Sequence, residues 1–178
     1  MSRKVKVVVL RTAGTNCDQE TKFAFELAGA GVELLHINEI IRKNKKLSGY
    51  SILAIPGGFT YGDDIAAGKI LANELRFLIG GEIQQFIQQG RLILGICNGF
   101  QVLVKMGLLP GVETKRQEVT LTVNDSAKFE DRWVYLKTKN QQPRTKSQEL
   151  RANKCVWTKG LPEIIYLPVA HGEGKFVA

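Results

Sequence analysis

Residues 93–103 read ILGICNGFQVL, an aliphatic run that stops at a cysteine between two glycines and then resumes with the spacing of a helix. Similar short runs rich in valine and isoleucine occupy residues 4–10, 32–37, 50–56 and 91–96. Such runs are typical of strands that a parallel sheet buries on both faces. Helical patterns lie between or after them, at residues 18–28, 82–90 and 99–109. Strands that alternate with helices predict an α/β fold, with a doubly wound, mostly parallel sheet and helices on both faces.

The pattern changes after Gly111. Residues 118–125 and 131–139 have the composition of strands, and residues 140–154 are polar and loop-like. We therefore expect strand hairpins added to the sheet domain, and a single domain over residues 1–178. In the first helical segment, periodicity predicts that one face points to the core, formed by Phe23, Ala24, Leu27 and Ala28.

Composition is that of an ordinary globular protein of 178 residues, with 44% hydrophobic and 24% charged residues. No apolar stretch is long enough to span a bilayer and no cleavage-type site follows the first residues, so we expect a cytoplasmic protein.

The net charge is +8, but lysine and arginine cluster only at residues 42–46 and no nucleic-acid-binding motif accompanies them. A solvated basic surface, or a face for an acidic protein partner, is favoured over nucleic acid. The three cysteines lack the spacing of a metal site.

Cys97 follows the fourth strand-like run and precedes a helix, within Gly95-Ile96-Cys97-Asn98-Gly99. This is the layout of a nucleophile elbow, with sulfur in place of a hydroxyl. The positive end of the following helix favours the thiolate, and its free N–H groups can hold an oxyanion, that of Asn98 above all. A buried structural cysteine is the alternative. The position at a strand end favours the nucleophile.

A second glycine-rich loop, PGGFTYGDD at residues 56–64, also follows a strand-like run. Adjacent glycines let backbone N–H groups turn into a cavity, so this loop is a candidate for the other oxyanion donor. A plain connecting loop is the alternative. The carboxyl ends of neighbouring parallel strands meet at one edge, which predicts that this loop lies beside Cys97.

A thiol nucleophile needs a base, and the sequence contains two histidines. His36 falls inside a strand-like run, where a structural histidine is the favoured interpretation. His171 lies two residues before Glu173, and on an extended segment that spacing puts both side chains on one face. Internal features alone thus indicate a triad of Cys97, His171 and Glu173.

Five segments together resemble the glutamine amidotransferase subunit of phosphoribosylformylglycinamidine synthase, a class I glutamine amidotransferase. They are RTAGTNCD (11–18), PGGFTYGDD (56–64), GICNGFQ (95–101), NDSAKFEDRWVYLK (124–137) and PVAHGEG (168–174). The resemblance implies the flavodoxin-like fold of that class and a glutaminase in which Cys97 forms a thioester. It also implies an oxyanion hole from Gly58 and Asn98, and a glutamine pocket lined by Phe59, Tyr61, Gly62 and Gln101.

The same resemblance implies that ammonia passes to a synthase partner in purine biosynthesis, with a small accessory subunit in the assembly. No cofactor is implied for this chain, whereas ATP and Mg²⁺ are expected in the synthase. In the family the base and its carboxylate lie in a later Pro-His-Pro-Glu segment. This sequence ends at Ala178 before such a segment, so we expect a shortened chain in which His171 and Glu173 are not the catalytic pair. Two alternatives stay open: a catalytically silent module that docks on the synthase, and a cysteine hydrolase of the same superfamily.

Overall fold

The computed structural model describes residues 4–111, 116–138 and 155–178. Its contacts divide the chain into two compact units. We call Met1–Ser126 with Glu173–Ala178 the sheet unit, and Ala127–Gly172 the hairpin unit. The single domain over residues 1–178 stays a prediction, and the polar segment at 140–154 lies outside the described residues.

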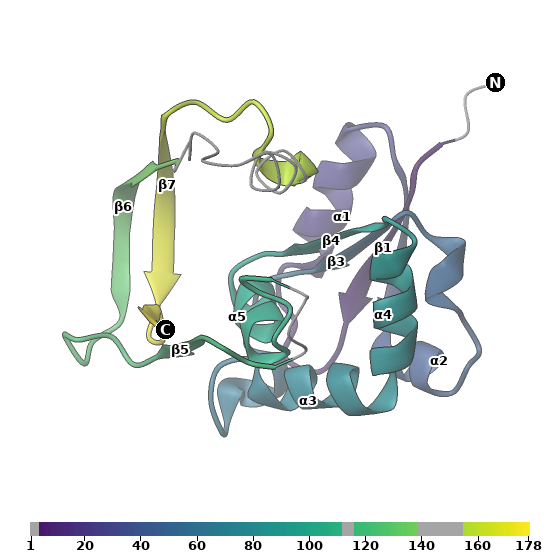
Figure 1. Cartoon of the computed structure of the whole chain (residues 1–178), viewed down its shortest axis with the longest axis horizontal. Coiled ribbons are helices and arrows are strands. Elements are labelled where there is room, and N and C mark those ends of the chain that lie inside the picture. Colours follow the sequence, from purple (N-terminus) through teal and green to yellow (C-terminus); the bar gives the residue numbers. More distant parts are fainter. Residues whose placement is uncertain (1–3, 112–115, 139–154) are drawn as a thin grey trace, which may run out of the picture. The chain divides into compact units, whose positions relative to one another are not determined.

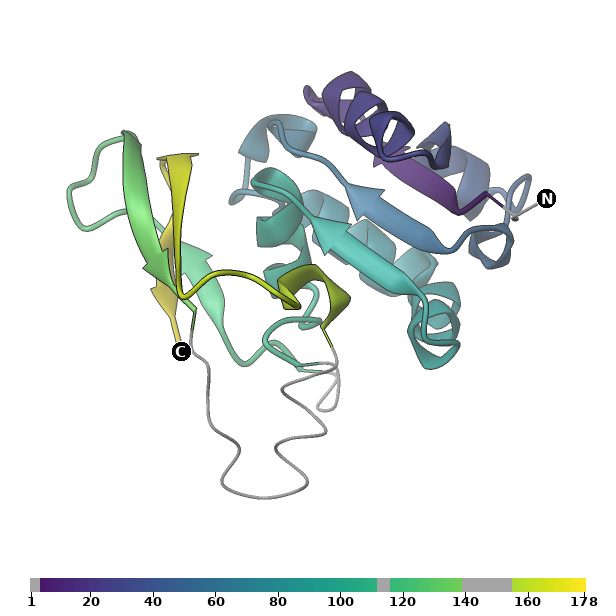
Figure 2. The same cartoon turned by 90° about the horizontal axis from the view of Figure 1, so that it is seen from above.

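The sheet unit is built on four parallel strands in the order β2-β1-β3-β4. Their bounds are β1 Lys6–Arg11, β2 Gly31–His36, β3 Ile52–Ile55 and β4 Leu92–Gly95. These are the four strands that the aliphatic runs predict, and the α/β class with a parallel sheet is confirmed. In Figure 2, β1 (purple), β3 (blue) and β4 (teal) run side by side in one direction.

Helices cover both faces of this sheet (Figure 1). The sequence predicts α1, α4 and α5, but it missed α2 and α3, which begin without a strong start signal. The bounds are α1 Asp18–Leu27, α2 Ile37–Ile41, α3 Lys69–Leu78, α4 Gly80–Gln88 and α5 Asn98–Lys105, with 3₁₀ turns η1 Leu47–Gly49 and η2 Thr60–Asp63. No helix in the described part of the chain has the length and apolar character needed to cross a membrane.

Alternate residues of each strand supply two separate cores. On one face, Val8 and Leu53 pack in a large cluster against α3, α4 and α5, which contribute Leu71, Leu75, Ile83, Phe86 and Val102. On the other face, Val7, Val9 and Ala54 are fully buried, and Phe25 of α1 packs against them. The strands are thus apolar on both sides because both sides are covered.

The predicted inward face of α1 is wrong. Phe23 and Leu27 are 66% and 79% exposed, and Ala24 and Ala28 are exposed too. The buried positions are Asp18 and Thr21, with Phe25 partly buried one turn further on. The Thr21 hydroxyl donates to the carbonyl of Cys17 at 2.6 Å, which satisfies this buried hydroxyl at the start of the helix.

The strands after Gly111 form two antiparallel pairs that do not join the parallel sheet. In the sheet unit, β5 (Thr120–Thr122) pairs with β8 (Lys175–Val177). In the hairpin unit, β6 (Glu130–Lys137) pairs with β7 (Ile164–His171), and η3 covers Val156–Thr158. Aromatic stacking on one face supports the second pair, with ring centroids of Trp133 and Tyr135 at 4.9 and 4.6 Å from that of Tyr166. The antiparallel hairpins predicted after residue 111 are confirmed.

Candidate active site

Three loops leave the same edge of the parallel sheet, at the carboxyl ends of β1, β3 and β4. Backbone hydrogen bonds join the first two loops. The N–H of Phe59 donates to the carbonyl of Gly14 at 2.8 Å, and the N–H of Asn16 donates to that of Gly57 at 3.3 Å. The sequence-predicted loop at residues 56–64 is therefore held at the strand end where Cys97 also lies.

Cys97 occupies a sharp turn between β4 and α5, with φ 53° and ψ −111°. A side chain other than glycine is strained at such a positive φ, and strain of this kind is characteristic of nucleophile elbows. The turn needs its flanking glycines. A Cβ on Gly99 would lie 1.9 Å from the carbonyl oxygen of Ile55, and a Cβ on Gly95 would lie 2.5 Å from that of Gly99. Cys97 itself is exposed, so the buried-cysteine interpretation is wrong.

The glycine pair of the β3 loop lies against Cys97. A Cβ on Gly57 would be only 3.2 Å from the Cβ of Cys97. Gly58 has φ 137°, and a Cβ there would lie 2.5 Å from the backbone nitrogen of Asn16. Within the described residues, the backbone N–H groups of Gly58 and Asn98 donate no hydrogen bond. Two donors, one in the residue after Cys97 and one in the residue after Gly57, are thus available to a ligand.

The Asn98 side chain joins the elbow to the β3 loop. It is 1% exposed, and its oxygen accepts hydrogen bonds from the N–H and hydroxyl of Thr60 at 3.2 and 2.7 Å. Its nitrogen donates to Oδ1 of Asp63 at 3.0 Å and to Oε1 of Gln101 at 3.1 Å. Sequence reasoning missed Thr60 and Asp63, because contacts across 38 and 35 residues have no periodic signal.

The four predicted pocket residues differ in their surroundings. Phe59 is 57% exposed, and Gly62 lies in the left-handed region at φ 70°. The Tyr61 hydroxyl donates to Glu74 of α3 at 2.7 Å; burial and then this bond raise the pKa of Tyr61. Gln101 is buried, and its amide donates to the backbone oxygen of Glu173 at 2.9 Å. Phe59 and Gly62 are thus open to a ligand, whereas the polar groups of Tyr61 and Gln101 already have protein partners.

Glu173 is held inside the sheet unit. Its two carboxylate oxygens accept from the N–H of Ala67 at 3.1 Å each, and Nζ of Lys105 lies 3.2 Å from Oε2. Because β7 ends at His171, one extended strand does not carry both His171 and Glu173. The extended geometry that would put an imidazole base and its carboxylate on one face is therefore absent. The Glu173 carboxylate instead binds Ala67 and Lys105. His171 belongs to the hairpin unit.

His36 has a structural role. It is the last residue of β2, and its Nδ1 accepts from the N–H of Asn38 at 3.2 Å, which caps the first turn of α2. The interpretation as a strand-end structural histidine is confirmed.

Cys17 is a second thiol near the site that the sequence did not assign. A Cβ on Gly57 would lie 3.7 Å from the Sγ of Cys17 and 3.2 Å from the Cβ of Cys97, so both cysteines lie close to Gly57. Burial raises the pKa of Cys17, and electrostatic interactions with Glu20, Cys97 and Asp18 raise it further. Cys17 is consequently a protonated neighbour of the candidate nucleophile at neutral pH. Among the described residues, no three or more His, Cys, Asp and Glu side chains gather as metal ligands.

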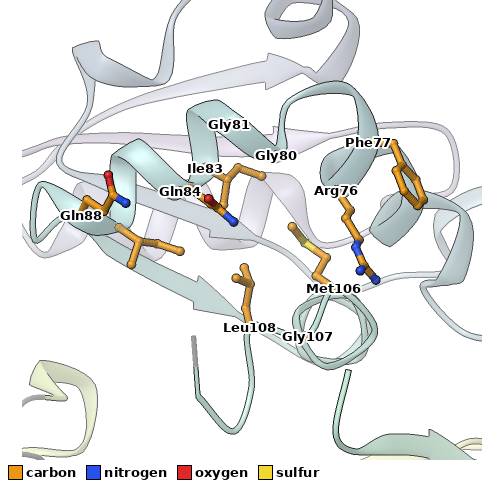
Figure 3. Close-up of a pocket in the computed structure, with 11 residues that line it drawn as sticks. Arg76, Phe77, Gly80, Gly81, Ile83, Gln84, Gln88, Met106, Gly107 and Leu108 are labelled. Carbon is orange, nitrogen blue, oxygen red and sulfur yellow. The ribbon is translucent and has the colours of Figure 1, made fainter. Parts of the chain in front are cut away.

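A cavity of about 480 Å³ lies at the other end of α5 (Figure 3). Its wall includes Arg76, Ile83, Gln84, Met106 and Leu108. None of its lining residues belongs to the three loops around Cys97, so this hollow is separate from the candidate active site.

Comparisons with known proteins identify the family of this chain. A family model described as a CobB/CobQ-like glutamine amidotransferase domain matches residues 4–178. The phosphoribosylformylglycinamidine synthase subunit PurQ of Dehalococcoides mccartyi is 51% identical over 174 residues, which are 98% of this chain and 64% of that protein. PurQ of Methanococcus maripaludis is 40% identical over 173 residues, 96% of this chain and 59% of that protein. This chain thus spans less than two thirds of the length of these relatives.

A solved structure, that of PurLQS from Thermotoga maritima, has a chain of similar fold. Its TM-score is 0.71 at 31% identity, and the match covers 98% of this chain and 70% of that one. The family model covers nearly the whole chain, and the solved structure shares its fold. The chain therefore belongs to the CobB/CobQ-like glutamine amidotransferase family.

Proposed function

We propose that this chain is the glutaminase subunit of phosphoribosylformylglycinamidine synthase. In this proposal Cys97 releases ammonia from the side-chain amide of glutamine, and a synthase partner uses the ammonia to make formylglycinamidine ribonucleotide. The observation that carries the proposal is the exposed Cys97 thiol on its strained turn, next to the N–H groups of Gly58 and Asn98, which donate no hydrogen bond within the described part of the chain.

The chemistry follows from that arrangement. The sulfur of Cys97 attacks the amide carbon of glutamine, and the carbonyl oxygen becomes an oxyanion. Hydrogen bonds from Gly58 and Asn98 stabilise the developing charge, and α5 directs its positive end at the same point. The carbon–nitrogen bond then breaks, and the nitrogen leaves as ammonia with the proton that the Cys97 thiol lost. Water hydrolyses the remaining thioester, which releases glutamate and restores the thiol.

The surrounding loop supports an amide substrate. Phe59 and Gly62 are exposed next to Gly58, where they can contact the aliphatic part and the polar end of a glutamine. Gln101 and Tyr61 would shape the pocket from beneath, since their polar groups are bound to Glu173 and Glu74. His36 is not the base of this reaction because it caps α2.

The partner follows from the relatives. Proteins named PurQ match this chain, and the solved relative belongs to an assembly named PurLQS. We infer that the synthase subunit and a small accessory subunit are the partners here, and that ATP and Mg²⁺ act in the synthase. In the proposal this chain has no cofactor, because amide hydrolysis by a thiol nucleophile uses protein groups: the thiol, its base and the backbone donors.

The test is an intact mass spectrum before and after treatment with a diazo-ketone analogue of glutamine, which alkylates a thiol only where a glutamine pocket positions it. We expect one adduct, mapped to Cys97 and absent from Cys97→Ala, with Cys17 and Cys155 unmodified. An adduct without glutamine turnover in the presence of the synthase would indicate the silent docking module. Failure to form the adduct in a folded protein, while iodoacetamide still modifies Cys97, would favour a cysteine hydrolase with another substrate.

A further inference from the structure

A buried polar stripe runs down one face of α5. Asn98, Gln101 and Lys105 are spaced three and four residues apart, and all three are buried. A stripe of this kind normally faces solvent, since burial of polar groups is unfavourable unless each finds a partner. Here the partners are supplied by one residue, Glu173, and by the loop between β3 and α3.

The hydrogen bonds form a closed ring. The Glu173 backbone oxygen accepts from Gln101, and Oε1 of Gln101 accepts from Asn98. Asn98 also donates to Asp63, whose Oδ1 accepts from the N–H of Gly68 at 2.9 Å. The preceding N–H, that of Ala67, donates to the carboxylate of Glu173 and closes the ring.

The buried ammonium of Lys105 needs the carboxylate of Glu173 as its partner. Its side chain is 4% exposed, and the only carboxylate paired with it in the described chain is Glu173, itself 24% exposed. A buried ammonium that loses its partner is strongly unfavourable, so removal of the carboxylate forces the end of α5 to move or Lys105 to leave the interior.

We propose that Glu173 and Lys105 are positioning residues for the Cys97 site: together they hold the ring that fixes Asn98 and, through Thr60, the Gly58 loop. The proposal rests on the proposed glutaminase function. Neither residue touches the reacting atoms. Their effect is indirect: the ring joins the loop after β3, which carries the Gly58 donor, to the start of α5, which carries the Asn98 donor. A displacement of about 1 Å at such donors can lower the rate about a hundredfold.

The connection also links the site to the rest of the chain. Glu173 directly follows Gly172, the last residue of the hairpin unit. The covalent chain that leaves β7 therefore enters the ring within two residues of His171. Glu173 itself belongs to the sheet unit, and its contacts with Ala67, Gln101 and Lys105 all lie within that unit.

The test compares Glu173→Ala, Glu173→Gln and Lys105→Met with the double variant Lys105→Met/Glu173→Gln. Glutamine turnover is measured with the synthase partner, well below the melting temperature of each variant. We expect kcat to fall about tenfold to a hundredfold in Glu173→Ala, with KM within about threefold. The double variant should recover part of that loss, because it removes the buried charge together with its partner and keeps an acceptor for Ala67. Iodoacetamide should still modify Cys97 within about twofold of the wild-type rate.

Amide hydrogen exchange gives a readout that does not require catalysis. We expect faster exchange at residues 57–62 and 97–101 in Glu173→Ala, and near wild-type exchange in the double variant. Unchanged exchange in folded Glu173→Ala overturns the positioning role whether or not the wild type hydrolyses glutamine. Unchanged kcat in that variant, with an active wild type, overturns it as well.

If wild type forms no diazo-ketone adduct while exchange still rises in Glu173→Ala, the ring stands and the glutaminase proposal is the part that fails. If Glu173→Ala does not fold, the exchange and the kcat of Glu173→Gln are compared with those of the wild type instead.

Discussion

Thr60 donates two hydrogen bonds to the side-chain oxygen of Asn98, from its backbone N–H at 3.2 Å and from its hydroxyl at 2.7 Å. The two residues lie 38 positions apart and belong to different strand-end loops. Thr60 follows Gly58 in the β3 loop, and Asn98 follows Cys97 in the elbow. One buried contact therefore sets the separation between the two backbone donors that would hold the oxyanion.

Thr60→Val should weaken this contact while the volume of the side chain is kept. Loss of the hydroxyl leaves the Asn98 oxygen with a single donor, which should cost ~1 kcal/mol of unfolding free energy. We expect kcat for glutamine to fall several-fold, since the donors are less firmly placed. Chemical denaturation and steady-state kinetics measure the two effects. Thr138→Val is the matched control, because its exposed hydroxyl contacts the backbone of residues 162 and 163 in the hairpin unit and should change neither quantity.

Cys97→Ala and Cys97→Gly should both abolish glutamine hydrolysis but differ in stability. Alanine retains the strain of φ 53°, whereas glycine adopts this conformation without a steric penalty. After the larger entropy of glycine in the unfolded chain is included, we expect Cys97→Gly to be ~1 kcal/mol more stable than Cys97→Ala. Paired urea melts measure this difference. An equal or reversed order would show that the turn relaxes without strain, and residual turnover in either variant would remove Cys97 from its role.

Gly99→Ala should be strongly destabilising. A Cβ there would lie 1.9 Å from the carbonyl oxygen of Ile55, so α5 would have to move away from β3. We expect a loss of ~1–3 kcal/mol in unfolding free energy, and slower labelling of Cys97 by the diazo-ketone. Gly81→Ala is the control in another helix. No atom lies within 4 Å of its Cβ position, and alanine should stabilise α4 by ~0.5 kcal/mol. Similar melting temperatures for the two variants would contradict the close approach of α5 to β3.

The fold was largely predictable because its signals are local. Aliphatic runs predicted all four parallel strands, and the two glycines around Cys97 predicted the turn. Two helices were missed because their starts are weak. α3 begins after Gly68, which has φ 71° and no capping side chain, and α2 has only five residues. The inward face of α1 was misassigned because its apolar stripe, with Phe23 and Leu27, faces outward in the sheet unit.

The site was predictable only in part. Motif position predicted Cys97 on a turn between a strand and a helix with the N–H of Asn98 beside it, and the family resemblance implied Gly58; the turn is present, and the roles of the three residues stay predictions. The anchoring contacts of Thr60, Asp63 and Lys105 were not found. Each of them pairs with a residue far along the chain, and nothing in the spacing of an isolated threonine or lysine indicates such a partner.

Acid should weaken the contact of Glu33 with its neighbours at the edge of the sheet. Hydrogen bonds from Lys45 and then Tyr50 lower the pKa of Glu33. A lowered pKa in the folded protein means that the stabilisation is present above the usual carboxyl value and is lost as pH falls through the lowered one. Wild type should therefore exceed Glu33→Gln in unfolding free energy by at most ~1 kcal/mol near pH 7, because the groups are partly exposed. The difference should shrink towards about pH 3, as urea melts across that range would show. A difference that grows on acidification has the opposite sign and would contradict the lowered pKa.

His171→Ala should leave the glutamine-directed labelling of Cys97 within about twofold of wild type. An imidazole base needs an orienting carboxylate, and the carboxylate two residues away, that of Glu173, is occupied by Ala67 and Lys105. The labelling rate is measured by mass spectrometry with the diazo-ketone, with Cys97→Ala as the zero and circular dichroism as the check on folding. A hundredfold slower labelling in a folded His171→Ala protein would make His171 the base of the reaction. The anchoring of Glu173 would then have to be released before catalysis, and Glu173→Ala would be slow for a second reason.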